Sequence, residues 1–247
     1  MKKVNSDVAY EFIRKKILSG GFPPGYPLMT EALSALTKVS RTPVREALHR
    51  LKAEGLVTIR ARLGASVKKM DLKEFRETCD LRLALESHAA GLAALNHSSA
   101  DLREIKFALD GMRTTTGQIL AAKNEAPYID ELLQQDVRFH IAIMTAAKND
   151  LIKGEILRLH LVNRVSVRPS QGAQPFATKG ESDANRRKVL ASHEEIYEGI
   201  AKGNAAVAKL AMEKHIQDII DKSVPAFHAA SEDSPRGLTE EEMAYTS

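Results

Sequence analysis

The segment from Val39 to Leu56, VSRTPVREALHRLKAEGL, constrains the fold most because it combines a helix start, an apolar stripe and a basic face. Thr42 can cap the helix, and Pro43 fits its first turn, where a missing N–H costs nothing. Apolar residues recur at helical spacing: Val44, Ala47, Leu48 and Leu51. Polar residues gather at the N-terminal end and outer face: Ser40, Arg41, Thr42, Arg45 and His49. This pattern is typical of a helix that reads base edges, and also of an ordinary amphipathic helix with a solvated basic face.

The flanking sequence predicts two further helices and a hairpin. Residues 4–19 and 30–37 show helical apolar spacing, and the first of these helices ends at Gly20-Gly21. After Gly55 the chain favours short strands at 56–59 and 65–67. Three helices and a hairpin form a winged helix-turn-helix. At the wing tip, Arg60 and Arg62 would reach phosphates or a minor groove, and Gly64 would let the backbone approach closely.

Charge divides the chain at about residue 70. Residues 1–70 contain 14 Lys or Arg and 5 Asp or Glu, whereas the other 177 residues contain 22 and 27. The basic part therefore favours a polyanionic partner such as DNA. The single cysteine, Cys79, excludes an internal disulfide, and the chain shows neither a signal peptide nor an apolar run long enough to cross a bilayer. We expect a cytoplasmic protein.

From Asp71 onward, apolar residues recur every three or four positions and predict an all-helical bundle. The expected helices cover 71–97, 99–123, 127–147, 150–169, 184–202 and 204–222. The predicted fold is therefore mainly α. It has a winged helix-turn-helix DNA-binding domain at 1–70, an all-helical effector-binding and dimerisation domain at 71–225, and a flexible tail at 226–247.

Histidines and a carboxylate in the helical part suggest a metal site. Asp136 and His140 lie one helical turn apart, and His193 and His215 lie in apolar patterns further along the chain. Three imidazoles and one carboxylate suit a divalent ion such as zinc, nickel or manganese, with a position left for a ligand oxygen. Because the chain has 8 histidines, satisfied polar groups in a helical core would show the same pattern.

A second polar pair, Arg82 and Glu86, also lies one helical turn apart. It is either a helix ion pair or part of a cavity in which Arg82 grips a ligand carboxylate in bidentate fashion. Asn163 and Arg164 are further candidates for lining that cavity.

Three segments of the N-terminal part resemble the DNA-binding domain of the GntR family of bacterial transcriptional regulators: LSGGFPPGYPL, VSRTPVREALHRLKAEGLV and RLGASV. The resemblance implies DNA contacts at Ser40, Arg41, Thr42, Arg45 and the wing from Arg60 to Gly64. The chain departs from the family at Thr30-Glu31, where Glu-Arg is common, and at Thr37-Lys38, where Leu-Gly is usual. Glu31 cannot make an arginine's phosphate contact, and Lys38 predicts a left-handed residue or a different turn.

The helical part resembles the FCD effector domain of the FadR-type GntR subfamily through 81–86 (LRLALE), 136–140 (DVRFH), 193–200 (HEEIYEGI) and the helix that carries 212–215. In metal-binding members of that subfamily the ligands are an Asp and three His at these places. The resemblance therefore implies a divalent metal, with zinc favoured, held by Asp136, His140, His193 and His215. Arg82, Glu86, Asn163 and Arg164 are the expected effector-binding residues.

These inferences predict a ligand-responsive regulator that binds double-stranded operator DNA as a homodimer and senses a small carboxylate effector. Repression relieved by the ligand is the favoured sign of regulation, and no catalytic residue is expected. A helical metal-dependent hydrolase is disfavoured because there is neither an HExxH motif nor a general base reserved for chemistry. A DNA-binding dimer without metal or ligand sensing is the other alternative.

Overall fold

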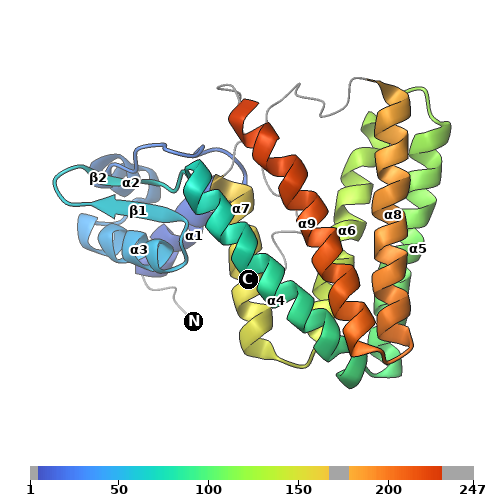
Figure 1. Ribbon diagram of the computed structural model, residues 1–247. Coiled ribbons are helices and arrows are strands. Elements are labelled where there is room, and N and C mark those ends of the chain that lie inside the picture. Colours follow the sequence, from blue (N-terminus) through green and yellow to red (C-terminus); the bar gives the residue numbers. More distant parts are fainter. Residues whose placement is uncertain (1–4, 167–177, 230–247) are drawn as a thin grey trace. The chain divides into compact units, whose positions relative to one another are not determined.

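The computed structural model describes residues 5–166 and 178–229, without the side chains of 164, 166 and 223–229. Its described residues form two compact units (Figure 1). The first comprises 5–75, 158–166 and 226–229, and the second comprises 76–157 and 178–225. No helix in these ranges is both apolar enough and long enough to span a membrane.

The first unit is the predicted winged helix-turn-helix. It contains α1 (Asn5–Leu18), α2 (Thr30–Thr37), α3 (Arg41–Ala53), β1 (Val57–Arg60) and β2 (Gly64–Val67). The strands form an antiparallel hairpin whose register runs from the Val57–Val67 pair to the Arg60–Gly64 pair. Apolar side chains from α1, α3 and the wing fill the core, and Leu161 and Val165 complete it. The apolar stripe predicted for α3 lies in this core: Val44, Ala47, Leu48 and Leu51.

The turn between α2 and α3 differs from a glycine turn in its sequence but not in its backbone. Lys38 has φ 57° and ψ 29°, which confirms the left-handed residue among the two predicted alternatives. The Ser34 hydroxyl donates to the Val39 carbonyl at 2.5 Å and closes the turn. The prediction that Thr42 caps α3 is wrong, because the helix begins at Arg41 and Ser40 occupies the N-cap position.

The second unit is an all-helical bundle, as predicted. It is built from α4 (Leu72–Asn96), α5 (Ser99–Ala121), α6 (Ala126–Ala146), the start of α7 (Asp150–Ser166), α8 (Lys179–Ala201) and α9 (Ala205–Ala229). Phe139, Ile143, Ile196 and Met212 are among its fully buried side chains. Because a Cβ at Gly199 would lie 2.7 Å from the backbone nitrogen of Ala208, only glycine permits α8 and α9 to approach this closely.

Two helices extend beyond their predicted bounds. The expected start of α8 was residue 184, but the helix begins at Lys179, because Thr178 and Glu181 form a reciprocal capping box. The Thr178 hydroxyl accepts from the Glu181 backbone N–H at 3.2 Å, and the Glu181 carboxylate accepts from the Thr178 N–H at 3.2 Å. The second of these helices, α9, continues to Ala229, whereas the sequence predicts that it ends at residue 222. Of the expected tail at 226–247, residues 230–247 lie outside the described residues.

Candidate functional site

Three helices of the second unit bring three buried histidines together. His140 comes from α6, His193 from α8 and His215 from α9, and one nitrogen of each lies within 4.8 Å of the others. The ring centroids of His193 and His215 are 4.3 Å apart, and those of His140 and His215 are 5.2 Å apart. The side chain of Phe139, which is fully buried, lies edge-on to His193 and closes one side of the cluster.

Asp136 adds a carboxylate to this cluster. It precedes His140 by one turn of α6, and its Oδ1 lies 3.1 Å from His193 Nε2. Its side chain is 38% exposed, whereas that of His193 is fully buried, so the carboxylate borders solvent. All four side chains that were predicted as metal ligands therefore meet in one place.

The hydrogen bond at the far side of His193 fixes which ring nitrogen can bind a metal. Its Nδ1 lies 2.7 Å from the Val189 carbonyl oxygen, one turn earlier on α8. Because a carbonyl only accepts, the Nδ1 carries a proton, which leaves Nε2 as the nitrogen that a metal could bind in place of a proton. That Nε2 is the atom that faces Asp136.

A two-step relay fixes His215 in the same way. The Ser192 hydroxyl donates to the Val189 carbonyl at 2.7 Å, so its oxygen accepts from His215 Nδ1 at 2.9 Å. The lone pair of His215 is therefore on Nε2, which is buried and has no hydrogen-bond partner among the described residues. A buried acceptor in this state is a ready metal ligand.

His140 is oriented by a buried ion pair. Its Nδ1 lies 3.3 Å from Glu86 Oε2, and the Arg82 Nε donates to Glu86 Oε1 at 2.9 Å. The side chain of Glu86 is fully buried and that of Arg82 is 9% exposed. Of the two interpretations of this pair, the structure shows the ion pair, in a buried rather than a surface setting. A carboxylate behind a ligating imidazole raises its basicity and fixes its orientation.

The pKa values of these groups follow from their burial and from one another's charges. Burial, with the charges of His193 and His140, lowers the pKa of His215 to about 2, so the ring is neutral at pH 7. Desolvation would raise the pKa of Asp136, but the His193 hydrogen bond and the nearby imidazoles outweigh it and hold that pKa well below its usual range. Burial would also lower the pKa of His140, yet the hydrogen bond to Glu86 and the charge of Asp136 raise it. One carboxylate and three imidazoles are a donor set that fits a divalent ion, which would take the place of the protons on the ligating nitrogens.

The other two predicted effector residues lie in the first unit. Asn163 lies in the part of α7 that belongs to the first unit, and its Oδ1 is buried without a hydrogen-bond partner among the described residues. The side chain of Arg164 lies outside those that the structure describes.

The first unit carries a second candidate site, a polar and basic face on α3 and the wing. Every side chain predicted to contact DNA is exposed, and so is the wing glycine. These residues are Ser40, Arg41, Thr42, Arg45, His49, Arg60, Arg62 and Gly64. Arg50, by contrast, is held within the domain by Asp7 at 2.7 Å and by the ring of Tyr10, whose centroid lies 4.0 Å from its guanidinium carbon.

Sequence reasoning missed three participants. Val189 and Ser192 support the histidines, and only their position on the same helix as His193 could have pointed to them. Glu31 pairs with Arg41 at 3.1 Å across the turn between α2 and α3. Its signal was the departure from the family's Glu-Arg pattern.

Two family profiles match the chain. The one described as "Bacterial regulatory proteins, gntR family" matches residues 5–67, and the one described as "FCD domain" matches residues 77–218. The HTH-type transcriptional regulator LutR of Bacillus subtilis strain 168 is 32% identical over 228 residues, which cover 83% of this chain and 94% of LutR. The HTH-type transcriptional repressor RspR of Escherichia coli strain K12 is 26% identical over 217 residues, 87% of each chain.

Solved structures share the fold. E. coli McbR/YncC superposes with a TM-score of 0.60 at 18% identity, covering 89% of this chain and 96% of that one. A transcriptional regulator GntR from Rhodococcus sp. RHA1 superposes with a TM-score of 0.60 at 22% identity, covering 92% and 99%.

Proposed function

The chain belongs to the gntR family of bacterial regulatory proteins and carries an FCD domain, and from this premise we propose that it is a ligand-responsive repressor whose helical domain binds one divalent metal ion and a small organic acid. Members of this family are transcriptional regulators that bind operator DNA, and dimers are typical of them. We assign the DNA-binding domain to residues 1–70 and the effector-binding and dimerisation domain to 71–225. The protein acts as a homodimer on a pseudo-palindromic operator in the cytoplasm.

The observation that carries the metal proposal is the convergence of three buried imidazoles beside the Asp136 carboxylate. Hydrogen bonds hold the Nδ1 atoms of His193 and His215, and Glu86 lies 3.3 Å from the Nδ1 of His140. The buried Nε2 atoms of His193 and His215 have no hydrogen-bond partner among the described residues, and a bound cation would satisfy both. Zinc is favoured, with nickel and manganese as alternatives, because all three accept imidazole and carboxylate ligands.

When bound, the ion would supply a Lewis-acid centre that attracts the oxygen of a small carboxylate. Asp136 lies at the solvent side of the cluster, where the effector would enter. The Arg82 Nε is engaged by Glu86, so its remaining N–H groups would serve the effector carboxylate. Glu86 would keep His140 oriented.

On the DNA side, Arg41 and Arg45 at the start of α3 would contact guanine or phosphate. Ser40 and Thr42 would add base or phosphate contacts, and His49 would face the DNA on the same helix. The wing residues Arg60, Arg62 and Gly64 would contact phosphates or the adjacent minor groove. To regulate, the effector must bind two arrangements of the dimer with different affinity, and a coupling of about 1–3 kcal/mol would be ordinary.

The test of the metal site is elemental analysis of tag-free protein. We expect about one divalent ion per chain, lost in the double variant His140→Ala/His193→Ala. The matched control is His88→Ala, which removes an exposed histidine of α4 and should retain the ion. A wild-type protein without metal after divalent-ion supplementation would overturn the metal proposal and leave DNA binding untouched.

Operator binding and its release are tested on DNA selected from a random pool. Fluorescence anisotropy with the selected duplex should show tight binding that weakens when a metal-coordinating carboxylate is added. Binding that no carboxylate changes would favour the dimer without ligand sensing.

A further inference from the structure

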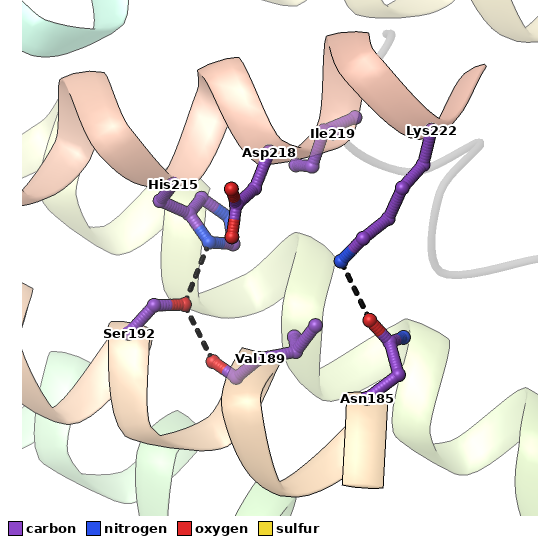
Figure 2. A pocket seen from close by; sticks show the side chains of 7 residues that line it. All are labelled: Asn185, Val189, Ser192, His215, Asp218, Ile219 and Lys222. Carbon is purple, nitrogen blue, oxygen red and sulfur yellow. Dashed lines mark hydrogen bonds between the residues drawn. The ribbon is translucent and has the colours of Figure 1, made fainter. Parts of the chain in front are cut away.

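A small pocket lies between α8 and α9, and His215 is part of its lining (Figure 2). It has a volume of about 220 Å³. One stripe of α8 and one stripe of α9 line it: Asn185, Val189, Ser192, His215, Asp218, Ile219 and Lys222. Sites for drug-sized ligands measure roughly 300–1,000 Å³, so this pocket suits a smaller molecule.

The end of the pocket farthest from His215 carries a positive charge that the described residues do not neutralise. Lys222 Nζ donates to the amide oxygen of Asn185 at 2.6 Å and forms no ion pair with a described carboxylate. Asp218, the acidic residue in the lining, is paired with Lys188 at 2.6 Å. The pocket therefore offers one ammonium whose partner is a neutral amide, a setting that attracts an anion.

The same end can hold both oxygens of a carboxylate. Because the Asn185 oxygen accepts from Lys222, the Nδ2 of Asn185 keeps its two N–H donors. The Lys222 ammonium also has N–H groups beyond the one that Asn185 accepts. A carboxylate placed there would receive a hydrogen bond from each residue, one of them charge-assisted.

The rest of the lining selects against a second negative charge. Val189 and Ile219 are the apolar lining residues in the middle, and Asp218 lies beside His215 at the opposite end (Figure 2). A second carboxylate, or a phosphate dianion, would meet the Asp218 carboxylate there and would have to compete with it for Lys188. The lining thus fits a carboxylate head followed by a short apolar chain.

We propose that the pocket between α8 and α9 is a binding site for a small monocarboxylate, with Lys222 and Asn185 holding the carboxylate and Val189 and Ile219 contacting the chain. Lys222 lies seven residues after His215 on α9, about 10 Å along the helix axis, so this carboxylate does not coordinate a metal at the histidines. The site is therefore separate from the metal-bound effector of the proposed function and does not need the metal. It still touches Ser192, whose hydroxyl accepts from His215.

The test is a titration of the full-length protein with butyrate, pentanoate and hexanoate, followed by saturation-transfer NMR. We expect saturable binding of at least one of the three, more than tenfold weaker for the corresponding neutral amide and more than tenfold weaker in Lys222→Met. The matched control is Lys209→Met, which removes an exposed lysine of the same helix and should leave binding unchanged.

A near-isosteric variant distinguishes loss of the binding site from loss of the folded structure. Asn185→Asp changes no heavy-atom volume, and its new carboxylate would pair with Lys222 and exclude the ligand. It should weaken binding as Lys222→Met does, while circular dichroism and the thermal midpoint show an intact bundle. Binding that survives both variants overturns the proposal.

The double variant His140→Ala/His193→Ala separates this site from the metal centre. Binding retained in that variant supports the pocket, whether or not the wild type holds metal. Binding that is lost there but persists in Lys222→Met places the carboxylate at the histidines, which overturns this proposal and leaves the proposed function standing. No saturable binding of any of the three acids also overturns it.

Discussion

The two candidate sites place their polar residues in opposite settings. On α3 and the wing, every residue predicted to contact DNA is exposed, and the ion pair between Arg41 and Glu31 is more than half exposed on both sides. Around the histidines, Glu86 is fully buried and each imidazole has a specific partner. Exposed ion pairs contribute little free energy to folding, so removing one partner changes stability little. A buried ion pair stabilises the fold only while every charged partner is present, because removing one leaves the other buried and uncompensated. Substitutions at the predicted DNA contacts of the first unit should therefore change DNA binding without changing stability. Substitutions around the histidines of the second unit should change ligand binding and stability together.

The largest expected effect is that of removing Glu86. Glu86→Ala would leave Arg82 and His140 buried without their carboxylate, which costs about 3–5 kcal/mol of unfolding free energy. Urea denaturation of the wild type and the variant measures this. The double variant Arg82→Met/Glu86→Leu removes both charges together and should recover most of the loss. Equal losses in the two variants would contradict the coupling described for this unit.

A smaller effect, on acid stability, is expected at Asp101 in the capping box of α5. Burial would raise the pKa of Asp101, but hydrogen bonds from Lys148 and Ser98 outweigh it and lower the pKa to about 2. A carboxyl with a depressed pKa stabilises the fold above its unfolded value near 3.8 and loses that contribution as pH falls toward 2. Because the partner Lys148 is half exposed and solvent screens the pair, the contribution at pH 7 is about 1 kcal/mol.

The measurement compares Asp101→Asn with the wild type. We expect a difference in unfolding free energy at pH 7 that shrinks as the pH falls from 4 to 2. The control Asp80→Asn, at an exposed position of α4, should show no such convergence. A difference in unfolding free energy that stays constant with pH would contradict the depressed pKa of Asp101.

Arg45→Ala should weaken binding without changing stability. Its side chain is exposed on α3, so the unfolding free energy should change by less than about 0.5 kcal/mol. Loss of a base contact would cost about 1–3 kcal/mol of operator affinity, or roughly 5- to 150-fold. Anisotropy on the selected operator tests this, with Glu46→Ala on the same helix as a control. Unchanged operator affinity would show that α3 does not read DNA through this residue.

The smallest effect is expected at the exposed pair between Glu31 and Arg41. Glu31→Gln should change stability by only a few tenths of a kcal/mol, because such pairs are screened by solvent. It also frees Arg41 and removes a negative charge near the expected phosphates, so affinity for unrelated DNA should rise slightly, most visibly at low salt. A change of several degrees in the thermal midpoint of Glu31→Gln would contradict the expectation that exposed ion pairs contribute little to stability.

The sequence predicted the features that depend on periodicity and on residue type. The i,i+4 spacing placed Asp136 and His140 on one face of α6, and the αL position of Lys38 was one of the two alternatives predicted by a lysine at a position where glycine is usual. The supports of the histidines were out of reach, because a backbone carbonyl such as that of Val189 occurs at every position and carries no sequence signal. The Lys222–Asn185 contact joins residues 37 apart on separate helices, a distance over which local patterns say nothing.

The shared role of Val189 has a consequence for how the metal ligands can change. One main-chain oxygen receives both the His193 ring and the Ser192 hydroxyl that holds His215, so no side-chain replacement at residue 189 removes that oxygen. The two hydrogen bonds to this oxygen therefore do not depend on the side chain at residue 189, so long as the helix persists. Conversely, a local unwinding of α8 at this single peptide would release two imidazoles at once. If the proposed metal is bound here, it would be lost all at once when this single helical turn unwinds, because two of its ligands are released together.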